Sequence, residues 1–231
     1  MQNKEIRLAS RPAGMPTLDN FNTIDTVVPQ PKDGGSFGPH ALHFSRSIPA
    51  WSHARRTLTV CQIAKIKGCR VIGIAGSNEK NRFLKEELAV DGAINYKHGD
   101  IRRAMKEACP NGIDVYFDNV GGSVSDAILP LLNQAARVAI CGQISIYNLD
   151  QPDIGLRPQP YLLVSSAMMK GFIITGYAAR FSEGIRQLDQ WLSEGKLKYA
   201  ETIVEGFENT PRAFIGLFSG ENLGKQIVKI V

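Results

Sequence analysis

The sequence predicts an α/β fold built on a parallel β-sheet, and three features carry that prediction. From residue 61 onward, short β-branched runs alternate with segments whose apolar residues recur at helical spacing. The loops between them are short. Glycines, prolines and capping residues stand where the segments end. Strands that alternate with helices in this way form a doubly wound parallel sheet, with helices covering both faces.

The region from residue 61 to residue 140 contains the clearest alternation. Its β-branched runs give four expected strands: residues 70–75, 93–96, 113–117 and 137–140. Gly68 follows the end of the first helix, and Ser77 or Asn78 caps the second. Asp100 caps a third helix, which ends before Pro110. A helix over residues 123–133 begins with a capping box in which Asp126 replaces the usual glutamate.

The last third of the chain continues the pattern with longer helices. The expected helices are residues 161–169, residues 182–194 before Gly195, and a helix from Thr210 to Gly220; the expected strands are residues 172–177, 202–205 and 226–231. Residues 1–60 differ from this regular part. Residues 29–39 are rich in glycine and proline, so we expect a boundary there. Only a short strand at residues 41–44 is expected before residue 53, and Pro49 interrupts the weak helical pattern beside it.

Length, composition and charge exclude several classes of protein. The chain has 231 residues, of which 43% are apolar and 21% charged, so it can form a core within one or two domains. A net charge of +5 suits an anionic ligand, but the basic residues are too scattered to predict nucleic-acid binding. The four cysteines form no CxxC pair, so neither a metal site nor a disulfide scaffold is expected. No apolar stretch predicts a leader or a membrane span, and we expect a cytoplasmic protein.

The candidate site lies in the loops after the strands, because parallel sheets bind ligands at the carboxyl ends of their strands. After residues 70–75, Ser77 and Lys80 occupy a position where an NAD site usually carries an acid. This arrangement favours the 2′-phosphate of NADP, although Glu79 counts against it and an ordinary turn explains the same residues. Tyr96 could donate a hydrogen bond to the same phosphate.

The next two loops could hold the rest of a nucleotide. Asn119 precedes two glycines that allow close approach of a ligand to the backbone. In the second of these loops Cys141 is followed by Gly142, and Ser145 is a hydrogen-bond donor. Plain turn chemistry, and a small buried thiol, explain these residues equally well. Tyr147 is a candidate proton donor, because a phenol with an ordinary pKa of about 10 keeps its proton at neutral pH.

Several ordered motifs resemble one family over residues 61–231. They are QIAKIKGCRVIGIAGSNEK, INYK, IDVYFDNVGG, RVAICGQIS, MKGFIITGY, WLSEGKLKY and the final IVEGFENTPRAFIGLFSGENLGKQIVKIV. They resemble the zinc-free, NADP-dependent medium-chain reductases, within them the curcumin, prostaglandin and leukotriene-type double-bond reductases. LASRPAG near the N-terminus is similar to the opening of that family's substrate domain. The resemblance implies NADP as cofactor, an enone or enal as substrate, no metal, and a homodimer as one open possibility.

The resemblance also implies a division of the chain and a role for each site residue. Residues 1–33 would be a remnant of a GroES-like substrate domain, 34–60 an altered linker, 61–177 the Rossmann-like NADP-binding domain, and 178–231 a segment completing the sheet and the substrate domain. The implied cofactor contacts are Ser77, Lys80, Tyr96, Asn119, Cys141, Gly142, Ile144, Ser145, Phe172, Ile173, Ile174 and Asn222, with Tyr147 near the reacting carbonyl.

Two departures from the family pattern lower the activity that we expect. No glycine occurs between Gly38 and Gly68, although the family has a glycine-rich loop there for the pyrophosphate. About a hundred residues, the size of a small domain, are missing after Gly34. An internal deletion with a shifted reading frame over residues 34–60 is our hypothesis. The alternatives to an impaired double-bond reductase are a quinone-type reductase and a non-catalytic remnant that binds a nucleotide or a protein partner.

Overall fold

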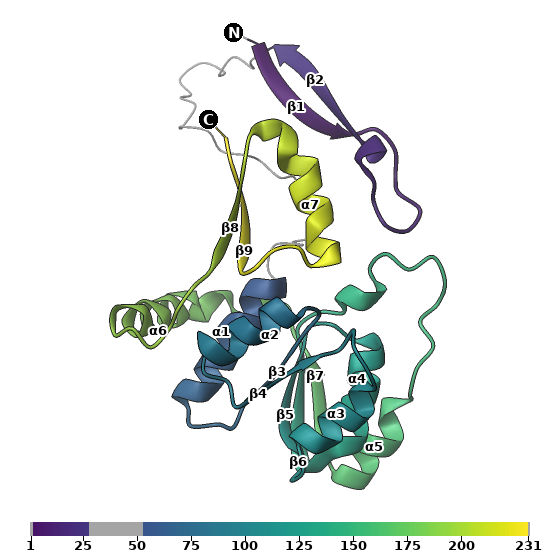
Figure 1. Cartoon of the computed structure of the whole chain (residues 1–231), viewed down its shortest axis with the longest axis vertical. Helices are drawn as coiled ribbons and strands as arrows, with labels where there is room; N and C mark the ends of the chain where they lie inside the picture. The colour runs from purple at the N-terminus through teal and green to yellow at the C-terminus, as the bar shows by residue number, and fades with distance from the viewer. Residues whose placement is uncertain (1, 28–52, 231) are drawn as a thin grey trace.

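The chain is described by a computed structural model that covers residues 2–27 and 53–230 (Figure 1). Its strands are β1 (Gln2–Leu8), β2 (Phe21–Val27), β3 (Ile72–Ala75), β4 (Gly92–Asn95), β5 (Ile113–Asp118), β6 (Leu132–Ile140), β7 (Met168–Gly171), β8 (Glu201–Glu205) and β9 (Lys225–Lys229). Its α-helices are α1 (His53–Ile66), α2 (Asn78–Glu86), α3 (Ile101–Ala108), α4 (Gly122–Ile128), α5 (Pro158–Ser165), α6 (Phe181–Ser193) and α7 (Thr210–Ser219). The strand predicted at residues 41–44 lies outside the described residues.

Local capping signals place most helix ends where the sequence predicts them. The Ser77 hydroxyl oxygen accepts a hydrogen bond from the Lys80 amide at 3.2 Å, so Ser77 is the cap of α2. The Asp100 carboxylate accepts from the Arg102 amide at 2.9 Å and caps α3. Gly68 and Gly220, which come after α1 and α7, have the positive φ angles of +79° and +73° that favour glycine after a helix.

The helix predicted over residues 123–133 is wrong in both its start and its end. Gly121, with φ +75°, precedes the helix, and no side chain caps it, so the predicted capping box at Ser123 does not form. The helix ends at Ile128, and β6 already begins at Leu132, which pairs with Ile113 of β5. Pairing with a neighbouring strand therefore outweighs the helical periodicity of these residues.

The segment from residue 161 to residue 177 also differs from the prediction. Helix α5 ends at Ser165, because Ser166 takes the left-handed conformation with φ +49°. The strand is β7, in which Met169 pairs with Val138 of β6. The predicted strand at residues 172–177 is wrong, since most of it belongs to a 3₁₀ helix at Ile174–Arg180. Apolar residues occur in the helix, in the strand and after it, so composition did not locate the strand.

The parallel sheet consists of two parts in the described structure. Strand β3 pairs with β4, and β5, β6 and β7 pair in that order, all in parallel. Among the described residues no strand joins β3 to β5. In the doubly wound order 3-2-1-4-5-6, β4 and β3 take places 3 and 2, and β5 to β7 take places 4 to 6.

Helices cover the two faces of the sheet and hold its parts together. Met105 of α3 and Ile128 of α4 belong to a core that also includes Ile72 of β3 and Ile113 of β5. This core therefore spans both parts of the sheet. A second core joins α1 and α2 to β3 and β4 around Leu84, which is almost fully buried. The predicted fold class, a Rossmann-like α/β fold, is confirmed.

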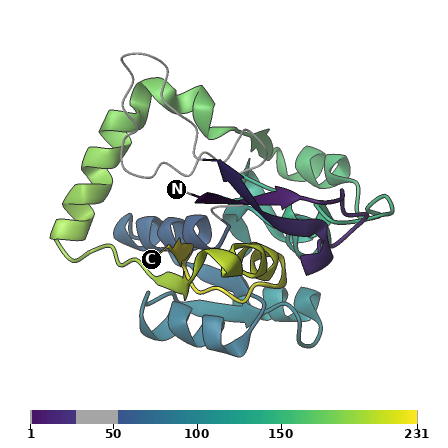
Figure 2. The ribbon, with the colours of Figure 1, turned by 90° about the horizontal axis from the view of Figure 1, so that it is seen from above.

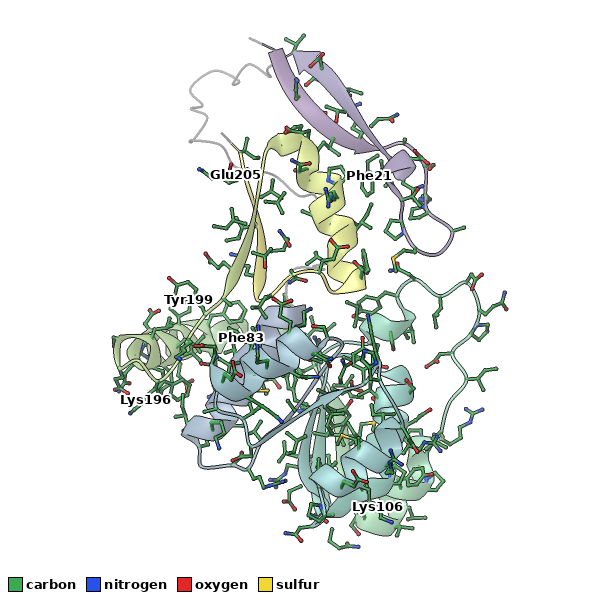
Figure 3. The ribbon with its side chains drawn as sticks, in the orientation of Figure 1. Phe21, Phe83, Lys106, Lys196, Tyr199 and Glu205 are labelled. Atoms are coloured by element: carbon green, nitrogen blue, oxygen red, sulfur yellow. The ribbon has the colours of Figure 1, made fainter. Side chains whose placement is uncertain are left out.

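The termini form a smaller unit beside the sheet. Strands β8 and β9 pair in parallel, and β1 and β2 form an antiparallel hairpin. Phe21 of β2 faces Phe214 of α7 with ring centroids 6.1 Å apart, and Figure 3 shows Phe21 beside that helix. Helix α6 lies at the outer edge of the molecule, as Figures 1 and 2 both show. None of the described helices is long and apolar enough to cross a membrane.

Candidate functional site

The three predicted phosphate contacts come together at the carboxyl ends of β3 and β4. They are Ser77, Lys80 and Tyr96. The backbone amide of Tyr96 donates to the Ala75 carbonyl at 3.2 Å, which joins the ends of the two strands. A Cβ atom on Gly76 would lie 3.1 Å from both the Tyr96 hydroxyl and the Lys97 side chain. Glycine therefore allows these two side chains to pack onto the turn that leads into α2. A phenol and an ammonium group consequently lie beside the N-terminus of a helix, where anions are favoured.

The ammonium group of Lys80 faces the same region and is partly buried. Its Nζ donates to the Gly220 carbonyl at 2.6 Å, so α2 is tied to the end of α7. Burial lowers the pKa of Lys80, and the nearby Lys97 ammonium lowers it further. A buried cation beside a second cation is stabilised when an anion binds between them. These groups can accommodate a phosphate.

The loop after β5 is organised by Asp118, a residue that the sequence did not single out. Asp118 is only 3% exposed. Its carboxylate accepts hydrogen bonds from the Val120 and Gly121 amides at 3.0 and 2.9 Å, from Ser125 Oγ at 2.7 Å and from Gln143 Nε2 at 2.9 Å. The last contact joins the loops after β5 and β6. The only sequence signal was an aspartate three residues before a Gly-Gly pair, which is typical of turns.

The same two loops are held together by backbone contacts. The Cys141 amide donates to the Asp118 carbonyl at 2.7 Å, and the Ser145 hydroxyl donates to the Val120 carbonyl at 2.6 Å. A Cβ atom on Gly121 would collide with the Gln143 amide, so the sequence needs glycine at this close approach. Asn119, Gly142 and Ile144 lie in these loops, so the structure brings them together as the sequence predicted.

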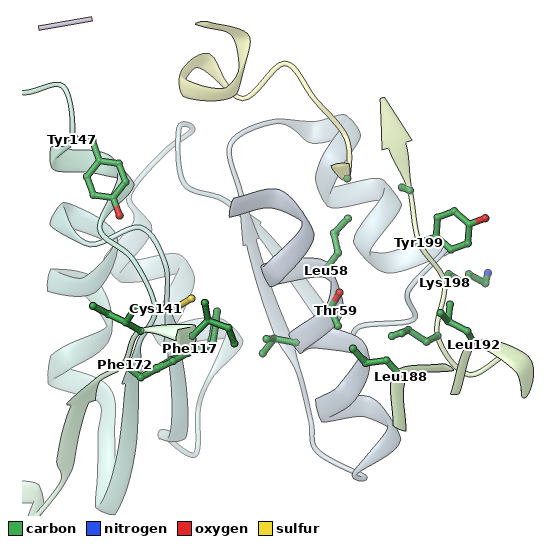
Figure 4. Close-up of a pocket in the computed structure, with 16 residues that line it drawn as sticks. Leu58, Thr59, Phe117, Cys141, Tyr147, Phe172, Leu188, Leu192, Lys198 and Tyr199 are labelled. Carbon is green, nitrogen blue, oxygen red and sulfur yellow. The ribbon is translucent and has the colours of Figure 1, made fainter. Parts of the chain in front are cut away.

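A cavity of about 600 Å³ opens beside the ends of β5, β6 and β7 (Figure 4). Five predicted residues line it: Cys141, Tyr147, Phe172, Ile173 and Ile174. Phe117 lines the same side, and most of the lining is apolar. Figure 4 shows the Tyr147 hydroxyl directed toward the side where Cys141 lies, and this oxygen accepts from the Gln143 amide at 3.3 Å. The predicted residues therefore form an anion-binding cluster at the ends of β3 and β4 and a separate apolar cavity at the ends of β5, β6 and β7.

Asn222 and the opposite wall of the cavity complete the site. Asn222 is buried, and its Nδ2 donates to the Gly224 carbonyl at 2.7 Å, so its amide holds the turn before β9. The second wall comes from elements that the sequence did not connect with the site, which are α1, α6 and residues 197–200. Spacing along the sequence gave no signal for them, because they lie far from the loops in the chain.

Parallel strands, covering helices and a polar cluster at the carboxyl ends of the strands define a nucleotide-binding fold of the Rossmann type. Residues 57–194 match the family model described as zinc-binding dehydrogenase. The chain belongs to this family, and the resemblance to the medium-chain reductases of the curcumin and prostaglandin type is confirmed.

The chain is similar to several individual proteins. YfmJ of Bacillus subtilis (strain 168) is 58% identical over 175 residues, which are 74% of this chain and 52% of the relative. The NADPH-dependent curcumin reductase of Escherichia coli (strain K12) is 43% identical over 177 residues, 74% of this chain and 51% of that enzyme. The crystal structure of CurA from Vibrio vulnificus in complex with NADPH superimposes with a TM-score of 0.83 at 30% identity, covering 99% of each chain. The chain spans about half the length of the curated relatives that it matches.

The donor groups of the described residues do not fit a zinc ion, although the family description names one. No three His, Cys, Asp or Glu side chains within residues 2–27 and 53–230 gather as metal ligands. Cys61 is a buried residue of α1, and burial raises the pKa of its thiol to about 11 and disfavours the thiolate that zinc binds. We therefore derive no chemical step through a metal.

Proposed function

We propose that this chain binds NADPH and reduces the C=C bond of α,β-unsaturated ketones and aldehydes. The observation that carries the proposal is the position of Lys80, partly buried beside Lys97 at the N-terminus of α2. An NAD site has an acid that grips the ribose 2′-hydroxyl, whereas this cluster has two cations and hydroxyl groups, whose charge Glu79 offsets only in part. Relatives named as NADPH-dependent, and CurA in complex with NADPH, support the same cofactor.

Each group of residues has a separate role in the proposed site. Residues 61–177 carry the nucleotide, and residues 178–231 complete the sheet and the cavity. The 2′-phosphate is held by Ser77, Lys80 and Tyr96. The Asp118 network holds the loops that carry Asn119, which contacts the ribose side of the cofactor. The proposed contacts on the nicotinamide side are Cys141, Gly142, Ile144, Ser145, Phe172, Ile173 and Ile174, with Asn222 from the returning C-terminal segment.

The proposed reaction needs a hydride for the β-carbon of the substrate, and bound NADPH supplies it. Tyr147 donates a hydrogen bond to the carbonyl oxygen of the substrate, which stabilises the negative charge that develops there. The enolate oxygen takes the Tyr147 proton to give an enol, and water returns a proton to Tyr147. The enol then becomes the saturated carbonyl compound as water adds a proton at the α-carbon and removes the proton on oxygen. The apolar side chains of Phe117 and Phe172 cover one side of the reacting carbons.

The proposed activity is lower than that of relatives with a complete substrate domain. Ile173, which would flank the nicotinamide, is 76% exposed. Tyr147 is exposed as well. Water near the reacting groups weakens the electrostatic stabilisation that the site provides. We therefore expect a low kcat even when the site is saturated with NADPH.

Nucleotide titrations test the binding part of the proposal. We expect NADPH to bind more tightly than NADH, measured by the fluorescence of the reduced nucleotide. Lys80→Met removes a charge-assisted hydrogen bond worth about 1.5–3 kcal/mol, so NADPH affinity falls about tenfold to a hundredfold while NADH affinity changes little. Lys85→Met, an exposed lysine on the same helix, is the matched control. Equal affinity of the wild-type chain for the two nucleotides contradicts the proposed cofactor.

Enone-dependent oxidation of NADPH tests the catalytic part. We expect one saturated product for each NADPH oxidised, and a lower rate for Tyr147→Phe with unchanged NADPH affinity. Binding of NADPH without oxidation by any enone would identify a non-catalytic remnant. Oxidation by quinones but not by enones would identify the quinone-type alternative.

A further inference from the structure

The wall of the cavity opposite β5 is a short extended segment between α6 and β8. It consists of residues 197–200, all of which line the cavity, and Figure 4 shows Lys198 and Tyr199 across from Phe117 and Cys141. Its far end is fixed because the Ala200 carbonyl accepts from the Lys225 amide at 2.8 Å. Its near end follows α6 and is held as well, because Leu197 is 8% exposed and its amide donates to the Trp191 carbonyl at 3.1 Å. Lys198 lies between these two fixed ends, and its backbone groups are held by a different element.

Gln62 of α1 provides that support. It is only 5% exposed, and its side chain contacts a residue 136 positions further along the chain. Gln62 Oε1 accepts from the Lys198 amide at 2.7 Å, and Gln62 Nε2 donates to the Lys198 carbonyl at 2.9 Å. The side chain thus satisfies both polar groups of one backbone residue, as a neighbouring strand does in a sheet.

The side-chain ion pair of Lys198 cannot hold the wall in the same way. Lys198 Nζ lies 3.1 Å from a carboxylate oxygen of Glu87, but both side chains are more than half exposed. Exposed ion pairs are screened and contribute little. The Gln62 side chain is only 5% exposed, so water competes less with its paired hydrogen bonds. Gln62 also donates to the Leu58 carbonyl at 3.2 Å, and Leu58 itself lines the cavity. The wall and α1 are therefore connected through one buried amide.

We infer that Gln62 is a positioning residue that fixes residues 197–200 against α1 in the second wall of the cavity, and that it thereby determines how long an apolar arm the bound enone can carry. The substrate part of this inference rests on the proposed reductase function. The positioning part does not. In the substrate part, the reacting carbonyl of the enone lies near Tyr147 and Cys141. Its apolar arm extends toward Leu188, Leu192 and the wall. A short enone does not reach that far.

Amide hydrogen exchange at Lys198, measured by NMR, tests the positioning role without any ligand. Gln62→Leu keeps the size of the side chain and removes both hydrogen bonds, so exchange accelerates about tenfold or more. Gln62→Glu keeps an acceptor for the Lys198 amide, and slow exchange is retained. Gln187→Leu, an exposed glutamine on α6 that bonds only within its own helix, leaves exchange unchanged. Unchanged exchange in Gln62→Leu overturns the inference.

A global loss of structure is distinguished from a local effect in the same spectra. The amide of Val138, in the middle of β6, reports the stability of the core, because Val138 is almost fully buried. Its exchange should be unaltered in all of the variants. If Gln62→Leu fails to fold, Gln62→Asn provides the test, because the same amide on a shorter side chain cannot reach both groups of Lys198.

Steady-state kinetics with NADPH tests the role in specificity. Methyl vinyl ketone is the short substrate, and its homologue with a linear hexyl tail on the β-carbon is the long one. In Gln62→Leu the KM of the long enone rises about tenfold, while its kcat and both constants of the short enone stay within about twofold. Equal changes for the two enones overturn the specificity role. If the wild-type chain reduces neither enone, the proposed function fails, and the exchange experiment still decides whether Gln62 positions the wall.

Discussion

Replacement of Asp118 by asparagine separates the role of its charge from that of its size. The substitution retains the shape of a side chain that accepts four hydrogen bonds in a buried position. One carbonyl oxygen can still accept from the Val120 and Gly121 amides. The new amide nitrogen then faces Ser125 Oγ, which can rotate to accept, and Gln143 Nε2, which cannot. Two donors are therefore brought together at the contact that joins the loops after β5 and β6.

The expected cost can be worked out from this inventory. One buried hydrogen bond to a charged group is lost, and a donor remains without a partner, which together cost about 2–3 kcal/mol. The double variant Asp118→Asn/Gln143→Glu supplies an acceptor opposite the new amide. It should recover about 1–2 kcal/mol relative to the sum of the two single variants, as expected for residues in contact.

Urea unfolding monitored by far-UV circular dichroism measures these differences. Single and double variants are compared at neutral pH with the wild-type chain. A free energy of unfolding for Asp118→Asn within about 0.5 kcal/mol of wild type, the range of ordinary surface substitutions, would refute the reasoning. Additive effects in the double variant would show that Asp118 and Gln143 are not coupled.

Three further predictions concern charge, packing and cofactor binding. The hydrogen bond from the Val71 amide holds the pKa of Asp91 below its ordinary value of 3.8. The ionised carboxylate therefore stabilises the fold above that pH, and this stability is lost as the pH falls. In urea unfolding, Asp91→Asn should cost about 1 kcal/mol at neutral pH and nothing in acid. Val115 in β5 is 68% exposed and Ile128 is 1% exposed, so Val115→Ala should cost less than about 0.5 kcal/mol and Ile128→Ala about 2–5 kcal/mol; similar costs would contradict the exposure of β5. Because Lys80 has a lowered pKa and a bound phosphate keeps it protonated, NADPH affinity should fall as pH rises through that pKa while NADH affinity stays level; a parallel fall for NADH would exclude Lys80 as the cause.

The sequence by itself determined the features that depend on near neighbours. Ser77 caps α2 through a residue three positions away, and Asp100 caps α3 through a residue two positions away. Gly220 ends α7 because of its own backbone conformation. The carboxyl ends of the strands carry the candidate residues because each loop comes directly after its strand. All of these interactions form within a few residues, so a local pattern records them.

The tertiary structure decided the features that depend on distant partners. The strand at Met168–Gly171 is fixed by pairing with β6, although the apolar run around it allowed other limits. Strands β3 and β5 are not paired with each other, and the strand order of the whole sheet decides which strands are neighbours. Gln62 has the pattern of an ordinary helix residue, and its role arises only because folding brings Lys198 to it. Hydrogen bonds between residues far apart in the chain leave no periodic trace, because their partners are selected by packing and not by spacing.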